Sequence, residues 1–404
     1  MKRDGVVGLG RAGRLLVLLL ALAAALQAQS AEPETEPERE AGILPFTPAE
    51  LQQIQAHGPW PPPRHRDASN RFVGQPAAVA FGRQLFFDAS LSARGDLACA
   101  SCHIPARAFQ DGRAVALPAG ERPRNTPSLF DAAGHRWLGW DGAHDSLWAA
   151  SITPLLAAGE MAAKPAHLAQ RLRARPALER AYTQAFGRPL PADPAQLPVD
   201  LGKALAAYQA TLVSPRTPFD DFRDAMARGD RRGAARYPLA AQRGLRLFIG
   251  EGRCTVCHAG PGFTNGEFAD IGVPFFVPGG VDSGRHGGLQ RLLASPWNRL
   301  GSHNDAGPAD PQAVATRHVV QQHRNFGEFR VPGLRQLVHT APYMHNGSLR
   351  TLPDVVRHYS ELNEERLHTD GERILRPLRL SPQQTDDLLA FLRSLSTVSP
   401  APAP

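Results

Sequence analysis

The pentapeptide CASCH at residues 99–103 recurs in altered form as CTVCH at residues 254–258. Together the two copies contain all four cysteines of the 404-residue chain, so no thiol is left over. In a C-x-x-C-H motif the two thiols form thioethers with the vinyl groups of a haem, and the histidine supplies an axial nitrogen to the iron. The pattern therefore predicts two covalently attached haem c groups. The residues that would bind them are Cys99, Cys102, His103, Cys254, Cys257 and His258.

Zinc sites and thioredoxin-like redox pairs also use C-x-x-C spacing. Neither of them requires a histidine directly after both cysteine pairs. Export to an oxidising compartment would also favour a disulfide over a free zinc-binding pair. Covalent haem is therefore the favoured interpretation.

The segments around the two motifs resemble each other, which indicates an internal duplication with a period near 155 residues. A Gly-x-x-x-Phe pattern precedes each motif, at residues 82–86 and 244–248. Each half later carries apolar residues at helical spacing, and in the second half Ser381-Pro382 forms a helix start signal. Strand-like alternation is rare. The predicted fold is mostly α, with two cytochrome c-like domains, one haem c in each, and long irregular loops.

The proline-containing, charged stretch between Ser214 and Tyr237 suggests the boundary between the halves. We expect the following organisation: a signal peptide at 1–30, a flexible lead-in at 31–44, an N-terminal cytochrome c-like domain at 45–214, a linker at 215–236, a C-terminal cytochrome c-like domain at 237–398 and a disordered tail at 399–404.

The first thirty residues have basic, apolar and small-residue regions in the order typical of a secretory signal peptide. Their apolar run, residues 15–26, is short for a membrane span, although an uncleaved anchor is the alternative. We therefore expect a periplasmic protein with no stable membrane insertion after cleavage. Removing four basic residues and one acidic residue lowers the formal charge from +7 to about +4. No basic block is interleaved with aromatic residues, which argues against nucleic-acid binding.

The sixth ligand of each iron decides between electron transfer and reaction with peroxide. After His103, residues 104–134 contain no histidine or methionine. Met161 lies about where a small electron-transfer cytochrome places its axial methionine, whereas Glu160 beside an open iron could act as an acid-base group for O–O cleavage. The residues alone leave both interpretations open.

For the second haem, Met344, several histidines and Tyr359 are candidates. Thr351 and Asp354 have capping-box spacing, and the helix that they begin carries Tyr359 on its apolar face. A packed core tyrosine is the simpler interpretation of that position. A phenolate ligand would stabilise oxidised iron, whereas a thioether favours the reduced state.

Taken together, these patterns resemble the bacterial di-haem cytochrome c peroxidase family, which includes the MauG proteins. The resemblance covers about Phe46 to Thr397. Besides the two C-x-x-C-H motifs, it rests on the segments Gly82–Ser92, Arg124–Ser128, Trp140–Gly142 and Val331–Asn346.

The resemblance implies roles for further residues. Glu160 takes the place of the family's distal glutamate, which makes it the acid-base catalyst and leaves Met161 to packing. Trp140 matches the tryptophan between the haems, a possible electron relay. Asn125 and the backbone carbonyls of Thr340 and Pro342 match a calcium site, an oxygen set that suits this cation.

Two departures from the activatable peroxidases refine the expectation. The loop after the first motif lacks their removable distal histidine, so the first iron should be open. Counting fourteen residues from His345 reaches Tyr359 where those peroxidases have methionine, as in MauG. The second haem is then expected to have His258 and Tyr359 as ligands.

We therefore predict a periplasmic di-haem enzyme that reduces hydrogen peroxide. Its electrons would come from a small cytochrome c or cupredoxin, or from a protein substrate in a MauG-like reaction. The alternative is a non-enzymatic electron-transfer cytochrome with Met161 and Met344 as axial ligands. A structural metal-binding protein is a weaker possibility.

Overall fold

The computed structural model describes residues 42–63, 67–116, 124–274, 276–277, 280–371 and 374–399. The predicted signal peptide, most of the predicted lead-in and nearly all of the predicted tail lie outside these residues. Within the described ranges, every helix is too short or too polar to cross a lipid bilayer.

The prediction of a mostly helical fold is confirmed. The α-helices are α3 (Pro48–Ala56), α4 (Pro76–Phe86), α5 (Cys99–Cys102), α6 (Leu147–Leu156), α7 (Pro165–Arg173), α8 (Pro176–Phe186), α9 (Leu197–Gln209), α10 (Pro218–Arg228), α11 (Arg231–Ala234), α12 (Leu239–Ile249), α13 (Arg285–Ala294), α14 (Ala313–His318), α15 (Leu352–Ser360) and α16 (Pro382–Ser394). The short strands β1 (Phe268–Ala269) and β4 (Phe329–Arg330) pair antiparallel, as do β2 (Phe276–Val277) and β3 (Gly280–Val281).

Each half is organised around one close crossing of two helices. In the N-terminal half α4 packs on α9, and a Cβ atom placed on Gly82 would lie 1.9 Å from the carbonyl oxygen of Ala204. In the C-terminal half α12 packs on α16, and a Cβ on Gly244 would lie 1.9 Å from the carbonyl oxygen of Asp387. Glycine is needed at both crossings because the backbones approach too closely for any side chain. The repeated sequence pattern thus corresponds to a repeated packing geometry.

The helices of the C-terminal half begin at the signals present in the sequence. The Ser381 hydroxyl accepts a hydrogen bond from the backbone N–H of Gln384 at 3.2 Å and starts α16. The Thr351 hydroxyl accepts one from the backbone N–H of Asp354, also at 3.2 Å, and starts α15. Such caps satisfy amide groups that would otherwise lack a partner, which fixes where each helix begins.

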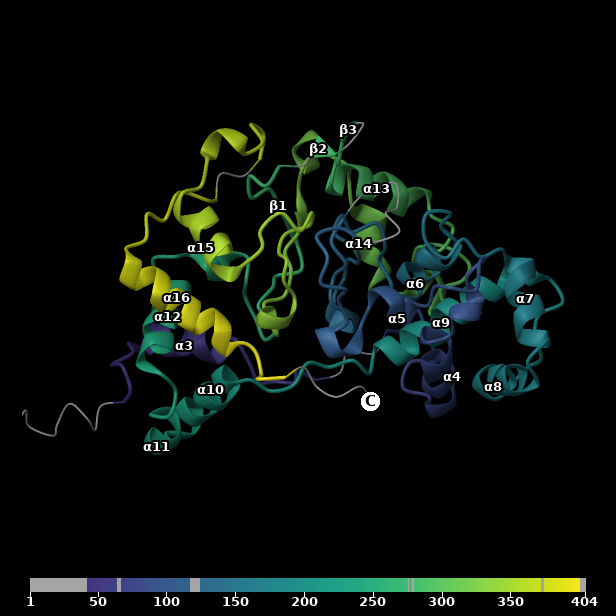
Figure 1. Cartoon of the computed structure of the whole chain (residues 1–404), viewed down its shortest axis with the longest axis horizontal. Coiled ribbons are helices and arrows are strands. Elements are labelled where there is room, and N and C mark those ends of the chain that lie inside the picture. Colours follow the sequence, from purple (N-terminus) through teal and green to yellow (C-terminus); the bar gives the residue numbers. More distant parts are fainter. Residues whose placement is uncertain are drawn as a thin grey trace, which may run out of the picture. The chain divides into compact units, whose positions relative to one another are not determined.

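Two segments outside the predicted C-terminal domain contribute residues to its hydrophobic cluster. Residues 215–236, expected to be a linker, contain α10 and α11, and Phe219 and Phe222 of α10 are buried in the hydrophobic cluster of the C-terminal half. Helix α3, expected in the N-terminal domain, contributes Ile54 to the same cluster, and in Figure 1 it lies beside α12 and α16. The many charged residues at 223–236 made this segment look like a linker. In the structure one face of α10 carries charged residues while the other face buries its phenylalanines.

The two halves are connected by polar and apolar contacts within the compact unit Ile43–Pro404. The Arg124 guanidinium donates to both carboxylate oxygens of Asp282 at 2.7 Å and to Asp141 at 2.5 Å. Trp137 packs against Leu289 and Leu292 of α13. These contacts give Arg124 and Asp141, both in segments singled out from the sequence, a role in joining the halves.

Candidate haem sites

Both motif histidines are oriented in the same way. The His103 Nδ1–H donates to the carbonyl oxygen of Phe109 at 2.9 Å, and the His258 Nδ1–H donates to that of Phe263, also at 2.9 Å. Burial is the main reason why the pKa of each imidazole lies below its usual value. A neutral ring with Nδ1 engaged leaves the Nε2 lone pair free for a metal, the arrangement expected of an axial ligand.

The cysteines fit covalent attachment. Cys99, Cys102, Cys254 and Cys257 are all free of disulfide bonds and only partly exposed. Burial raises the pKa of Cys99 and of Cys254 to about 12, so these thiols are protonated at neutral pH. Two thiols outside any disulfide beside a correctly oriented imidazole, found twice, suit two haem c groups better than a disulfide-based function.

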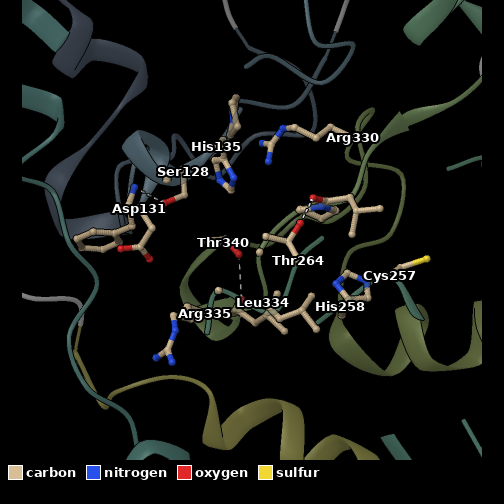
Figure 2. A pocket seen from close by; sticks show the side chains of 18 of the residues that line it. Ser128, Asp131, His135, Cys257, His258, Thr264, Arg330, Leu334, Arg335 and Thr340 are labelled. Carbon is tan, nitrogen blue, oxygen red and sulfur yellow. Dashed lines mark hydrogen bonds between the residues drawn. The ribbon is translucent and has the colours of Figure 1, made fainter. Parts of the chain in front are cut away.

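A large cavity of about 1750 Å³ lies beside the second motif. Cys254, Cys257, His258 and Tyr359 all line it, and Figure 2 shows Cys257 and His258 at one side of this space. Burial first, and then the two nearby thiols, raise the pKa of the Tyr359 phenol above its ordinary value. The chain therefore keeps this tyrosine neutral, and a phenolate would need the positive charge of a bound metal. Met344 also lines the cavity.

Glu160 lies near the first motif and apart from the large cavity. It follows the C-terminal end of α6, in a turn closed by hydrogen bonds from the Glu160 and Met161 amides to Ala157 and Pro154 at 3.0 and 3.1 Å. The negative charge of Glu160 contributes to the raised pKa of both Cys99 and Cys102, so the carboxyl lies within electrostatic reach of these thiols. The side chain is exposed, but the surrounding protein partly desolvates its carboxyl and raises its pKa.

A second, small cavity of about 180 Å³ is lined by Glu160. A volume of this size holds a few water-sized molecules. Met161 also borders it, but the Met161 side chain is buried in the hydrophobic cluster of the N-terminal half. The position of Met161 therefore agrees with the packing role that the resemblance implied.

Trp140 and the candidate calcium ligands meet at the large cavity. The Trp140 indole N–H donates to the carbonyl oxygen of Asn125 at 2.8 Å, and both residues line the cavity together with Thr340 and Pro342. The Asn125 amide nitrogen donates to the Arg113 carbonyl at 2.7 Å, so the amide oxygen is the atom that a cation would use. These four residues are brought together by the fold, whereas Glu160 is not among the described residues that line this cavity.

Two cavity-lining residues were not selected from the sequence as functional. Arg330 lies on β4 directly before the Val331–Asn346 motif, and His135 lies between the first motif and α6. No spacing rule pointed to either residue. Their importance depends on burial and on hydrogen-bond partners, which the sequence does not contain.

The fold and the two motif sites define a haem-binding oxidoreductase of the c-type cytochrome class. The family model described as di-haem cytochrome c peroxidase matches residues 76–228. Cytochrome-c peroxidase IdrP1 of Pseudomonas sp. strain SCT is 32% identical over 334 residues, covering 80% of this chain and 81% of that protein. Methylamine utilization protein MauG of Methylorubrum extorquens AM1 is 34% identical over 322 residues, covering 79% and 78%. The chain belongs to the di-haem cytochrome c peroxidase family.

Solved structures agree with this assignment. A MauG-like protein associated with microbial copper homeostasis is 28% identical, with a TM-score of 0.61 over 84% of this chain and 93% of that one. The di-haem peroxidase BthA of Burkholderia thailandensis E264 shares the fold, with a TM-score of 0.62, 24% identity and coverage of 83% and 89%. The prediction of a haem-dependent enzyme of the peroxidase class is confirmed by the curated relatives.

Proposed function

We propose that this protein is a periplasmic di-haem c enzyme that reduces hydrogen peroxide to two water molecules, taking up two protons and two electrons. The observation that carries the proposal is the unequal surroundings of two equivalent motifs. Near the first lies a carboxyl, Glu160, and near the second lies a phenol, Tyr359. Unequal surroundings give two irons different tasks.

At the first site, haem iron supplies the redox chemistry for O–O cleavage. His103 would hold that iron through Nε2, and its Nδ1–H bond to the Phe109 carbonyl fixes the plane of the ring. Glu160 would remove a proton from hydrogen peroxide and return it to the oxygen that leaves as water. A carboxyl with a raised pKa is suited to both steps, because its protonated and ionised forms are closer in energy near neutral pH.

At the second site, His258 and Tyr359 are the residues that would hold the iron. An anionic oxygen ligand favours the oxidised metal, so this site would hold an oxidising equivalent. Trp140 lines the cavity at this site, and its indole N–H donates to the Asn125 carbonyl. Two residues further along the chain, the carbonyl of Pro127 contacts His103 of the first motif. This connection supports Trp140 as the electron relay between the sites. A calcium ion held by Asn125, Thr340 and Pro342 is part of the proposal.

The electron donor is proposed to be a small cytochrome c or cupredoxin, or a protein substrate oxidised as in MauG. The proposed signal peptide at residues 1–30 supports a periplasmic location for the reaction. The relatives include proteins named for both kinds of reaction, cytochrome-c peroxidase and MauG.

The absorption spectrum of the purified ferric protein tests the proposal. We expect two haems per chain, one high-spin and one low-spin, without a thioether-to-iron band. Addition of hydrogen peroxide should change the spectrum within one turnover, and a reduced donor protein should restore it. Two low-spin haems with thioether bands and no response to peroxide would instead support the electron-transfer alternative with Met161 and Met344.

Replacing Tyr359 with methionine should raise the midpoint potential of the second haem by on the order of hundreds of millivolts, because a thioether stabilises ferrous iron. Spectroelectrochemical titration measures this shift. Met344→Leu is the matched control and should leave the potential nearly unchanged. If Met344→Leu shifts the potential and Tyr359→Met does not, Met344 is the ligand.

A further inference from the structure

The side chain of Arg330 is unusual among the arginines that line the large cavity. It is 7% exposed, and its Nη1 atom has no hydrogen-bond partner among the described residues. Its Nε donates only a long bond of 3.3 Å, to the Gly139 carbonyl. Burying a cationic donor without a partner is costly, so the buried Nη1 of Arg330 indicates a missing anion.

Arg335 lines the same cavity and provides the contrast. Its guanidinium donates to both carboxylate oxygens of Asp220 at 2.8 and 2.9 Å and to the Pro261 carbonyl at 2.7 Å. It also lies 3.6 Å from the ring centroid of Trp60. The charge of Arg335 is therefore neutralised by a carboxylate, whereas the Nη1 atom of Arg330 has no acceptor among the described residues.

The backbone fixes where Arg330 points. Strands β1 and β4 pair with Phe268 opposite Arg330, and the Arg330 N–H donates to the Trp140 carbonyl at 2.8 Å. Its neighbour Phe329 points the other way and stacks on His345, with ring centroids 3.5 Å apart. Because side chains alternate along a strand, burial of Phe329 on one side directs Arg330 to the other.

His135 lines the cavity near Arg330. Figure 2 shows both side chains on the same side of the cavity, well apart from the sulfur of Cys257. Burial first, and then the charge of Arg330, lower the pKa of His135 well below its usual value. His135 is therefore a neutral hydrogen-bond donor at pH 7, and burial lowers the pKa of Arg330 to about 10, which still leaves it charged.

The other charged groups of the surrounding elements already have partners. Glu267, which precedes β1, pairs with Arg136 at 3.6 Å. The Arg285 guanidinium lies 4.0 Å from the ring centroid of Phe268 and donates to the Gly142 carbonyl at 2.8 Å. No described carboxylate is thus available to neutralise Arg330.

We propose that Arg330 and His135 form the binding site for a propionate carboxylate of the haem attached at Cys254 and Cys257. The inference rests on the proposed second haem. The chemistry of the group supports it, because the propionates project from the edge of the macrocycle opposite its thioether-linked side. A site for them should therefore lie in the same cavity but away from the cysteines, which is where the Nη1 atom of Arg330 lacks a partner.

Arg330→Gln tests the proposal through the midpoint potential of the second haem. Without its cationic partner, an ionised propionate would destabilise ferrous iron, so the equilibrium constant for reduction should fall about tenfold at high pH, or about 59 mV for one electron. The propionate pKa should also rise, so the midpoint should become pH-dependent between about pH 6 and 9. Arg330→Lys should restore most of the wild-type behaviour.

Arg376→Gln is the matched control, because Arg376 is an exposed arginine that lines the same cavity. Because solvent screens the charge of Arg376, its loss should shift the midpoint potential of the second haem much less than Arg330→Gln does. A haem assay showing two haems per chain must accompany each measurement. If the wild-type protein contains one haem or none, the proposed function is refuted. If Arg330→Gln contains two haems and keeps the wild-type midpoint potential of the second haem, only the propionate site is refuted. If Arg330→Gln does not assemble, His135→Leu carries the test, with a smaller pH-dependent shift expected.

Discussion

Replacing Glu160 with glutamine is expected to slow the reaction of the resting ferric protein with hydrogen peroxide by about 10²- to 10⁴-fold. Glutamine keeps the size and the hydrogen-bonding shape of the side chain but cannot accept and return a proton. The peroxide proton would then have to leave through water. Stopped-flow absorption after mixing with peroxide measures the rate directly, and the midpoint potential of the second haem should stay unchanged.

The pH dependence of the same reaction provides a second readout. Desolvation raises the pKa of Glu160 above its ordinary value of 4.5, and the base form exists only above that raised pKa. The wild-type rate should therefore fall as the pH is lowered through the raised pKa, and this step should be missing in Glu160→Gln.

Glu365→Gln, on the exposed surface of the C-terminal half, is the charge-matched control and should react like the wild type. An unchanged rate in Glu160→Gln, with an unchanged pH profile, would remove Glu160 from the mechanism.

Replacing Gly244 with alanine is expected to destabilise the fold by about 2 kcal/mol, the upper end of the usual overpacking cost less the gain in helix propensity. The new methyl group would lie 1.9 Å from the Asp387 carbonyl oxygen and 2.9 Å from the Phe391 Cβ. A backbone oxygen cannot rotate away, so α12 and α16 must separate, and overpacking of this kind typically costs about 1–3 kcal/mol, sometimes more. The gain in helix propensity, about 1 kcal/mol, offsets only part of it. Chemical denaturation of the haem-loaded protein followed by circular dichroism measures the loss.

Gly82→Ala should behave in the same way, because its Cβ would lie 1.9 Å from the Ala204 carbonyl oxygen and 3.1 Å from the Tyr208 Cβ. Gly280→Ala is the control, since no described atom lies within 4 Å of the place that its new methyl group would take, and its backbone is compatible with alanine. Equal denaturation midpoints for Gly244→Ala and Gly280→Ala would contradict the interpretation that α12 and α16 cross too closely for a side chain.

The local features of the fold could be predicted because they depend on neighbouring residues. The caps at Ser381 and Thr351 involve groups three residues apart, so the starts of α16 and α15 were visible in the sequence. The Gly-x-x-x-Phe repeat correctly marked one helix of each half. The core that α3 and α10 join was not visible in the sequence, because the placement of a short amphipathic helix depends on long-range packing.

The candidate haem sites also combine features that the sequence predicts with features that depend on the folded chain. The two C-x-x-C-H motifs and their histidines follow from the sequence alone, because covalent attachment requires a fixed local spacing of thiols and imidazole. Three further features needed the folded chain: Tyr359 shares a cavity with His258, Glu160 lies near the first cysteine pair, and Arg330 is buried with an unpaired nitrogen. Burial and hydrogen-bond satisfaction are set by residues far apart in the chain, such as Arg330 and His135, which no sequence spacing relates.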